Sequence, residues 1–126
     1  MSLALLLFAA CANQVTIIPG QDGCIDYNFT DPAESTVDWE ASSGGTARAW
    51  RSNALMDQTG LIFEPNIAAD GNVIHVYEAW TGGETADAFC YEPSVAFEGV
   101  SGELQVRWYL AEGDTVPYDS VDIEAE

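Results

Sequence analysis

The stretch Glu103-Leu104-Gln105-Val106-Arg107-Trp108-Tyr109-Leu110 decides the fold class of this chain. Its apolar side chains, at positions 104, 106, 108 and 110, alternate strictly with the side chains at 103, 105, 107 and 109. A period of two puts one set on each face of an extended chain, so we expect a half-buried strand of an antiparallel sheet over residues 103–110. Trp108 is then a predicted core anchor, because large aromatic side chains supply much of the burial in a small domain.

The rest of the chain carries the same kind of pattern in short pieces. Residues 73–80 place Ile74, Val76 and Trp80 on one face, and a turn is expected over residues 81–84, Thr-Gly-Gly-Glu. Only residues 52–58 allow a helical turn. Further strands, separated by Gly, Pro and Asp turn signals, are expected over residues 14–18, 24–29, 36–41, 46–51, 60–63, 86–91, 94–98 and 118–124.

About eight or nine short strands at this spacing predict an all-β fold, an antiparallel two-sheet β-sandwich. The last four strands are expected to form a meander through short connections. Trp39 and Phe97 are expected to join Trp108 in the core between the sheets.

The charge of the chain excludes several function classes. The 126 residues include 21 Asp and Glu but only three Arg and no Lys, and the formal net charge is -18. Such a surface repels phosphate backbones and anionic lipid head groups, which excludes nucleic-acid binding and a polybasic membrane contact. Without Lys there is no Schiff-base chemistry and no P-loop lysine. The acidity has two interpretations, solubility in a marine or periplasmic setting and adaptation to high salt.

The first residues of the chain are typical of an export signal. Residues 3–10 are apolar, too short to cross a membrane as a helix, and of the length found in secretory signal peptides. The stretch Phe8-Ala9-Ala10-Cys11 resembles the lipobox of bacterial lipoproteins. That resemblance implies that Cys11 receives a diacylglyceryl group and becomes the mature N-terminus. The chain then divides into a signal peptide over 1–11, an N-terminal segment over 12–22 and a β-sandwich domain over 23–126.

Other interpretations of the leader stay open. Residues 3–10 could instead form a buried strand or helix, with Cys11 as an ordinary core thiol. The chain could also be a plain secreted protein, or an unprocessed one such as a virion component.

The three cysteines are consistent with export. If Cys11 carries lipid, Cys24 and Cys90 remain as one pair, and a bond between them would persist outside the cytosol. The alternative is two independent buried thiols.

Short motifs in the sandwich region resemble two families. Asn28-Phe29, Trp39 and the stretch 118–123, Tyr-Asp-Ser-Val-Asp-Ile, resemble the opening and closing segments of galactose-binding-like jelly rolls, in particular the family 4/9 carbohydrate-binding modules. That resemblance implies a jelly roll, often with a structural calcium. The spacing of Cys24, Trp39 and Cys90 resembles that of immunoglobulin-like domains, although position 88 is Ala where their tyrosine corner has Tyr. Both families are sandwiches.

Few residues point to chemistry. His75 lacks a Gly-x-Ser-x-Gly elbow, which leaves a small hydrolase as a minor alternative. Three widely spaced Cys and one His do not suit zinc. Glycan binding needs exposed aromatic side chains flanked by carboxylates and amides, and the candidates are Trp50, Trp80, Tyr77 and Tyr109. Calcium prefers carboxylates held in loops, and the candidates are Asp22, Asp70 and Asp114.

We therefore expect a non-catalytic bacterial cell-envelope lipoprotein, periplasmic or on the cell surface, held to the membrane by a lipid anchor. Its partner would be a glycan or an envelope protein, and no cofactor is expected beyond a structural calcium. The alternative from another class is a structural subunit of an extracellular or virion assembly.

Overall fold

A computed structural model describes residues 6–10, 13–25, 27–31 and 33–125. In these ranges the chain forms ten strands and no helix, so the all-β prediction is confirmed. Accordingly, no helix long and apolar enough to cross a membrane occurs in the described ranges. The strands are β1 Leu6–Ala10, β2 Asn13–Gly23, β3 Val37–Ser42, β4 Thr46–Arg51, β5 Ala54–Phe63, β6 Asn66–Asp70, β7 Val73–Tyr77, β8 Trp80–Glu98, β9 Gly102–Tyr109 and β10 Asp119–Ala125.

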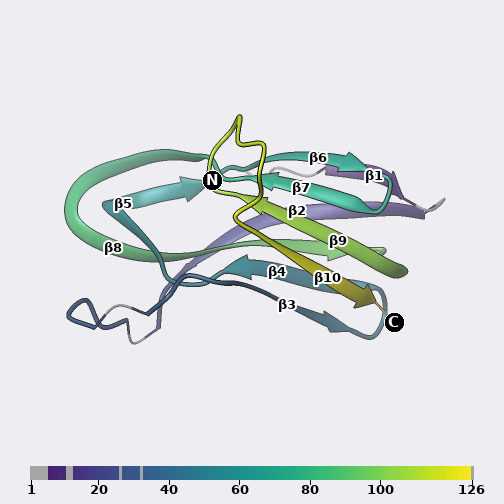
Figure 1. Cartoon of the computed structure of the whole chain (residues 1–126), viewed down its shortest axis with the longest axis horizontal. Helices are drawn as coiled ribbons and strands as arrows, with labels where there is room; N and C mark the ends of the chain where they lie inside the picture. The colour runs from purple at the N-terminus through teal and green to yellow at the C-terminus, as the bar shows by residue number, and fades with distance from the viewer. Residues whose placement is uncertain (1–5, 11–12, 26, 32, 126) are drawn as a thin grey trace.

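The strands form two sheets that pack as a sandwich (Figure 1). Sheet A has the order β1-β2-β8-β4-β3, and β5 pairs with another part of the long strand β8. Sheet B has the order β10-β9-β7-β6. The described pairs are antiparallel with one exception, because β7 and β9 run parallel. The predicted antiparallel two-sheet sandwich is therefore confirmed, with this parallel pair added in sheet B.

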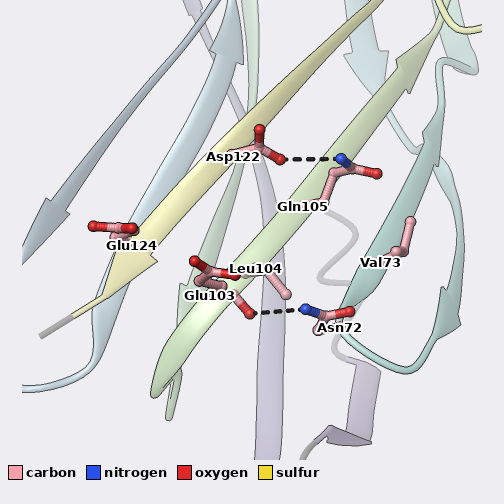
Figure 2. A pocket seen from close by; sticks show the side chains of 7 residues that line it. All are labelled: Asn72, Val73, Glu103, Leu104, Gln105, Asp122 and Glu124. Atoms are coloured by element: carbon pink, nitrogen blue, oxygen red, sulfur yellow. Dashed lines mark hydrogen bonds between the residues drawn. The ribbon is translucent and has the colours of Figure 1, made fainter.

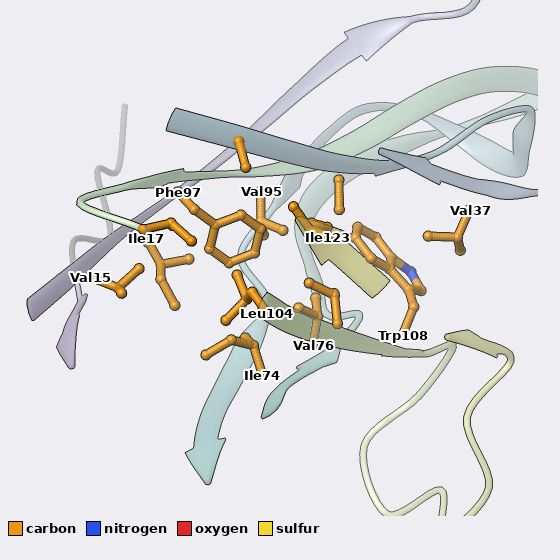
Figure 3. Packing of buried hydrophobic residues seen from close by; sticks show 14 of the residues in the cluster. Val15, Ile17, Val37, Ile74, Val76, Val95, Phe97, Leu104, Trp108 and Ile123 are labelled. Atoms are coloured by element: carbon orange, nitrogen blue, oxygen red, sulfur yellow. The ribbon is translucent and has the colours of Figure 1, made fainter. Parts of the chain in front are cut away.

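The core lies between the inner faces of the two sheets (Figure 3). Phe97 of β8 and Trp108 of β9 are fully buried there, as their patterns predict. The prediction that Trp39 lies in the core is wrong, since 39% of its surface is exposed. It lies on β3, the edge strand of sheet A, which has a hydrogen-bonded neighbour on one side only among the described strands. The buried apolar side chains of this core are Val15, Ile17, Val37, Ala47, Ala49, Phe63, Ile74, Val76, Val95, Phe97, Val100, Leu104, Val106, Trp108 and Ile123.

The predicted turn at 81–84 and the two short strands predicted after it are wrong, because the single strand β8 runs through these residues. The chain stays extended from Trp80 to Glu98, because β5 pairs with its first half while β2 and β4 flank its second half. Gly82 and Gly83 have positive φ angles of 72° and 95°, a conformation that glycine tolerates inside the bent strand. The predicted meander of the last four strands is also wrong, since β8 belongs to sheet A and β9 and β10 to sheet B.

Two other local predictions are wrong. Residues 52–58 form no helical turn, because from Ala54 onward the chain pairs with β8. Residues 24–29 are outside any strand in the described part of the chain. Here Cys24 leaves sheet A, and its amide donates to the Cys90 carbonyl at 3.1 Å.

The predicted Cys24–Cys90 disulfide is present, with the two Cα atoms 5.4 Å apart and a sequence separation of 66. It joins the end of β2 to the middle of β8, two strands that already pair as far as Gly23 and Tyr91. The covalent bond therefore extends an existing ladder.

Residues 6–10 contribute an edge strand to sheet A. Residues 6–10 of β1 pair antiparallel with residues 13–17 of β2, and β1 has no second neighbour among the described strands. Cys11, the predicted lipidation residue, lies outside the described residues.

Candidate functional site

The outer face of sheet B gathers the polar and aromatic residues that alternate with its core residues. The parallel register of β7 and β9 places His75 beside Arg107 and Tyr77 beside Tyr109. The same register pairs Ile74 with Val106 and Val76 with Trp108, all of which are buried in the core. We call the group of His75, Tyr77, Arg107 and Tyr109 the outer-face cluster.

The aromatic rings of the outer-face cluster are in contact. The rings of Tyr77 and Tyr109 stack with centroids 4.3 Å apart and planes inclined by 14°. The Nδ1 atom of His75 lies 2.8 Å from the Tyr109 hydroxyl oxygen, at hydrogen-bond distance. Only 4% of Tyr109 is exposed. Burial raises the pKa of the Tyr109 phenol and neighbouring Tyr77 raises it further, while Arg107 acts in the opposite direction.

A chain of hydrogen bonds leads from the cluster across β9 to β10. The Nε atom of Arg107 donates to Gln105 Oε1 at 2.7 Å. The Nε2 atom of Gln105 donates in turn to Asp122 Oδ1 at 3.0 Å. These two bonds link the side chains of Arg107, Gln105 and Asp122 on one face of the sheet.

A cavity of about 400 Å³ lies on this face next to the cluster (Figure 2). Val73 and Gln105 connect the two regions, since they precede His75 and Arg107 by two positions on the same strands. At the far end of the cavity, Glu103 and Glu124 lie directly opposite each other on β9 and β10. The lining residues are Asn72, Val73, Glu103, Leu104, Gln105, Asp122 and Glu124. We call this cavity the acidic groove.

The four predicted ligand-binding aromatics separate into three places. Tyr77 and Tyr109 come together in the outer-face cluster, but Trp50 and Trp80 lie elsewhere. Trp50 is on the outer side of sheet A, where the Arg48 guanidinium carbon lies 4.6 Å from the centre of its ring. Trp80 faces inward and packs on Phe63 and Tyr91, with ring centroids 5.0 Å and 5.1 Å away. The two tryptophans therefore do not line one groove.

A buried polar centre between the sheets was missed by the sequence analysis. Arg51 of β4 and Glu78, which follows β7, form a bidentate ion pair, in which Arg51 Nη2 donates to Glu78 Oε1 at 2.9 Å. The indole nitrogens of Trp80 and Trp108 also donate to Glu78, at 3.2 Å and 2.6 Å. A signal was present, because Glu78 interrupts the inward-facing series of Ile74, Val76 and Trp80.

The remaining predicted site residues lie on separate elements. Asp22 is on β2, Asp70 ends β6, and Asp114 lies in the loop between β9 and β10. The described residues contain no group of three His, Cys, Asp or Glu side chains arranged to hold a metal ion. His75 bonds a tyrosine and is not among the residues that line the acidic groove.

Comparison of the chain with models of protein families, with curated proteins and with solved structures finds no match.

Proposed function

We propose that this chain is a non-catalytic lipoprotein of the bacterial cell envelope that binds glycans on the outer face of sheet B. The observation that carries the proposal is the juxtaposition of the outer-face cluster and the acidic groove on one sheet face.

Glycan recognition requires both kinds of surface. Sugar rings present hydroxyl groups, which donate and accept hydrogen bonds, together with apolar C–H faces that pack on aromatic side chains. The acidic groove offers the acceptors of Asp122, Glu124 and Gln105, and the outer-face cluster offers the half-buried ring and phenol of Tyr77, which the buried Tyr109 ring supports from below. Because these groups stand on rigid strands and are already bonded to one another, little order would be lost on binding.

The lipoprotein part of the proposal has support from the leader and from strand direction. The lipobox-like stretch ends at Cys11, two residues before β2 begins at Asn13. The strands β2, β7 and β9 all run the same way through the sandwich (Figure 1). Tyr77 and Tyr109 end β7 and β9, so they lie at the end of the sandwich away from the start of β2. A lipid on Cys11 would then leave the tyrosine pair facing away from the membrane.

A lipid anchor is also compatible with the strong acidity. Acyl chains contribute about 0.8 kcal/mol for each buried methylene, so two or three chains can hold the domain against repulsion from an anionic surface. The net charge of -18 would keep the sandwich itself off the membrane.

Glycan binding is tested on an array of bacterial and plant polysaccharides, followed by calorimetry with the best ligand. We expect Tyr77→Ala to weaken binding by about tenfold or more, because a ring that stacks on a sugar contributes on the order of 1.5 kcal/mol. Tyr27→Ala, in the loop after β2, is the matched control and should bind normally. Binding that survives Tyr77→Ala in a folded variant would contradict the site, and no binding to any polysaccharide would contradict the function.

The anchor is tested by intact mass and by labelling of the expressed chain with a fatty acid. We expect an acylated chain that begins at Cys11 and has therefore lost the edge strand β1, and Cys11→Ser should abolish labelling. An unacylated chain that still begins at Met1 would contradict the lipoprotein and favour the structural-subunit alternative.

A further inference from the structure

The starting observation is that Arg107 forms no ion pair with any acidic side chain in the described ranges, although the chain is dominated by acids. The chain has three arginines and 21 Asp and Glu. Arg51 forms a buried ion pair with Glu78, and this is the one ion pair found among the described residues. Arg48 lies over the Trp50 ring and directly opposite Glu40 in the register of β3 and β4. Arg107 instead donates from Nε to the neutral amide of Gln105.

The bond to Gln105 has a geometric consequence for Arg107. It uses the Nε proton and leaves the two terminal nitrogens without a carboxylate in the described part of the chain. A guanidinium that presents two parallel N–H donors matches a carboxylate, which has two acceptor oxygens in the same spacing.

The neighbours of Arg107 are also suited to an anion. His75 is its register partner on β7, and the phenols of Tyr77 and Tyr109 belong to the same cluster. The Tyr77 phenol can donate a hydrogen bond, and so can one member of the hydrogen-bonded pair His75–Tyr109. The nearest acid along the hydrogen-bond chain is Asp122, which lies beyond Gln105 and is already bonded to it. The cluster is therefore a patch of donors, whereas the adjacent acidic groove is a patch of acceptors.

We propose that the glycan recognised on this face is an acidic one, and that Arg107 binds the carboxylate of a uronic acid residue. The hydroxyl groups of the same or the next sugar would donate to Asp122, Glu124 and the other acceptors of the acidic groove. This inference rests on the proposed glycan-binding function and adds the class of sugar to it. A uronic acid carries one carboxylate, which accepts hydrogen bonds, and several hydroxyl groups, which can donate them. The donors of the outer-face cluster match the carboxylate, and the acceptors of the acidic groove match the hydroxyl groups.

The sandwich as a whole repels such a ligand, and this repulsion sharpens the inference. Because the protein has a net charge of -18, it does not attract an acidic glycan at long range, and binding depends on the local arginine contact. Loss of that one positive charge should therefore remove the preference for the acid form.

The test uses the full chain and matched ligands. Oligomers of galacturonate, glucuronate and mannuronate are each compared by calorimetry with their methyl esters, which keep the sugar and remove only the negative charge. We expect at least one free acid to bind about tenfold more tightly than its ester, as charge-assisted hydrogen bonds imply. Arg107→Gln should abolish this preference while the ester still binds. Arg48→Gln, which removes the half-buried arginine on the outer side of sheet A, should leave the preference unchanged.

The outcomes separate this inference from the function beneath it. If no acid binds more tightly than its ester, or if the preference survives Arg107→Gln, the uronic acid inference is overturned. Binding of neutral polysaccharides that depends on Tyr77 would in that case still support the glycan site. If neither acidic nor neutral glycans bind, both proposals are overturned together.

Discussion

Arg51 and Glu78 connect the two sheets through a buried bidentate ion pair. Arg51 ends β4 in sheet A, and Glu78 follows β7 of sheet B. The indole N–H groups of Trp80 and Trp108 occupy further acceptor positions on the same carboxylate. No buried side-chain nitrogen or oxygen is left without a partner in the described residues, so this polar centre is fully satisfied. A satisfied network of this kind is costly to break at any one member.

We therefore expect Glu78→Gln to lower the free energy of unfolding by about 3 kcal/mol or more, because Arg51 would remain buried without a counter-charge. Glu98→Gln, at an exposed position of β8, is the control and should change stability by less than about 0.5 kcal/mol. Urea denaturation of both variants measures the difference. Equal stabilities would show that the ion pair contributes nothing to the join between the sheets.

Removal of the disulfide should destabilise the domain strongly. The bond closes a loop of 66 residues, and the chain-entropy estimate for that length is about 4 kcal/mol. Cys24→Ser combined with Cys90→Ser should show this loss in urea denaturation, and a reducing agent should reproduce it in the wild type. Cys11→Ser should unfold at the same urea concentration as the wild type. A midpoint that is insensitive to reduction would mean that the sulfurs are not bonded in solution.

The stability of the fold should decline in alkali through Tyr109. The pKa of its phenol is raised from the ordinary value of 10.0, chiefly by burial, so the folded state favours the protonated form. The unfolded chain releases this proton at lower pH than the folded one does. Stability contributed by the neutral phenol is thus fully present below pH 10 and is lost as the pH rises from about 10 towards the folded-state pKa.

Tyr109→Phe should therefore unfold with a weaker dependence on pH above about 10 than the wild type. In an ultraviolet titration, the phenolate absorbance that appears at the highest pH in the wild type should be missing in this variant. Identical alkaline denaturation curves for the two proteins would contradict the role of Tyr109.

The outer end of sheet B should be sensitive to salt. Glu103 and Glu124 lie directly opposite each other on β9 and β10, and like charges in such cross-strand pairs are destabilising. Glu124→Gln should raise the free energy of unfolding by about 0.5 kcal/mol at low salt, and most of the gain should be lost near 1 M salt, where the Debye length is about 3 Å. Glu84→Gln, which faces Thr59 on β5, should give no such gain. A gain that is independent of salt would have to come from a source other than charge.

Much of the fold could be predicted from alternation alone. The pattern in residues 46–51 matches β4 residue for residue, and the pattern at 103–110 matches β9 to within one residue at each end. These strands have one buried and one open face, so their sequences must alternate. Within β8, by contrast, the pair Gly82-Gly83 has the composition of a turn. Only its pairing with β5 keeps it extended, and that partner lies too far along the chain for a local pattern to reveal it.

The candidate site could be predicted only in part. Alternation indicated that Tyr77 and Tyr109 face outward from their strands, and the parallel pairing of β7 with β9 then brings their rings together. Nothing in the local sequence specifies that pairing, because the two strands are not consecutive. Arg107 gave no signal either, since its proposed role depends on which of the described side chains lie around it in three dimensions. Trp80 belongs to the interior because Phe63 and Tyr91 enclose it.

The parallel pairing of β7 and β9 also determines when the site can form during folding. Between these strands the chain leaves sheet B, builds all of β8 in sheet A, and only then returns. A hairpin could assemble early from neighbouring residues, but a parallel pair needs a long crossover to be in place first. Tyr77 and Tyr109 therefore meet only when the whole domain has closed. A fragment that lacks β8 should carry both tyrosines and still have no binding surface.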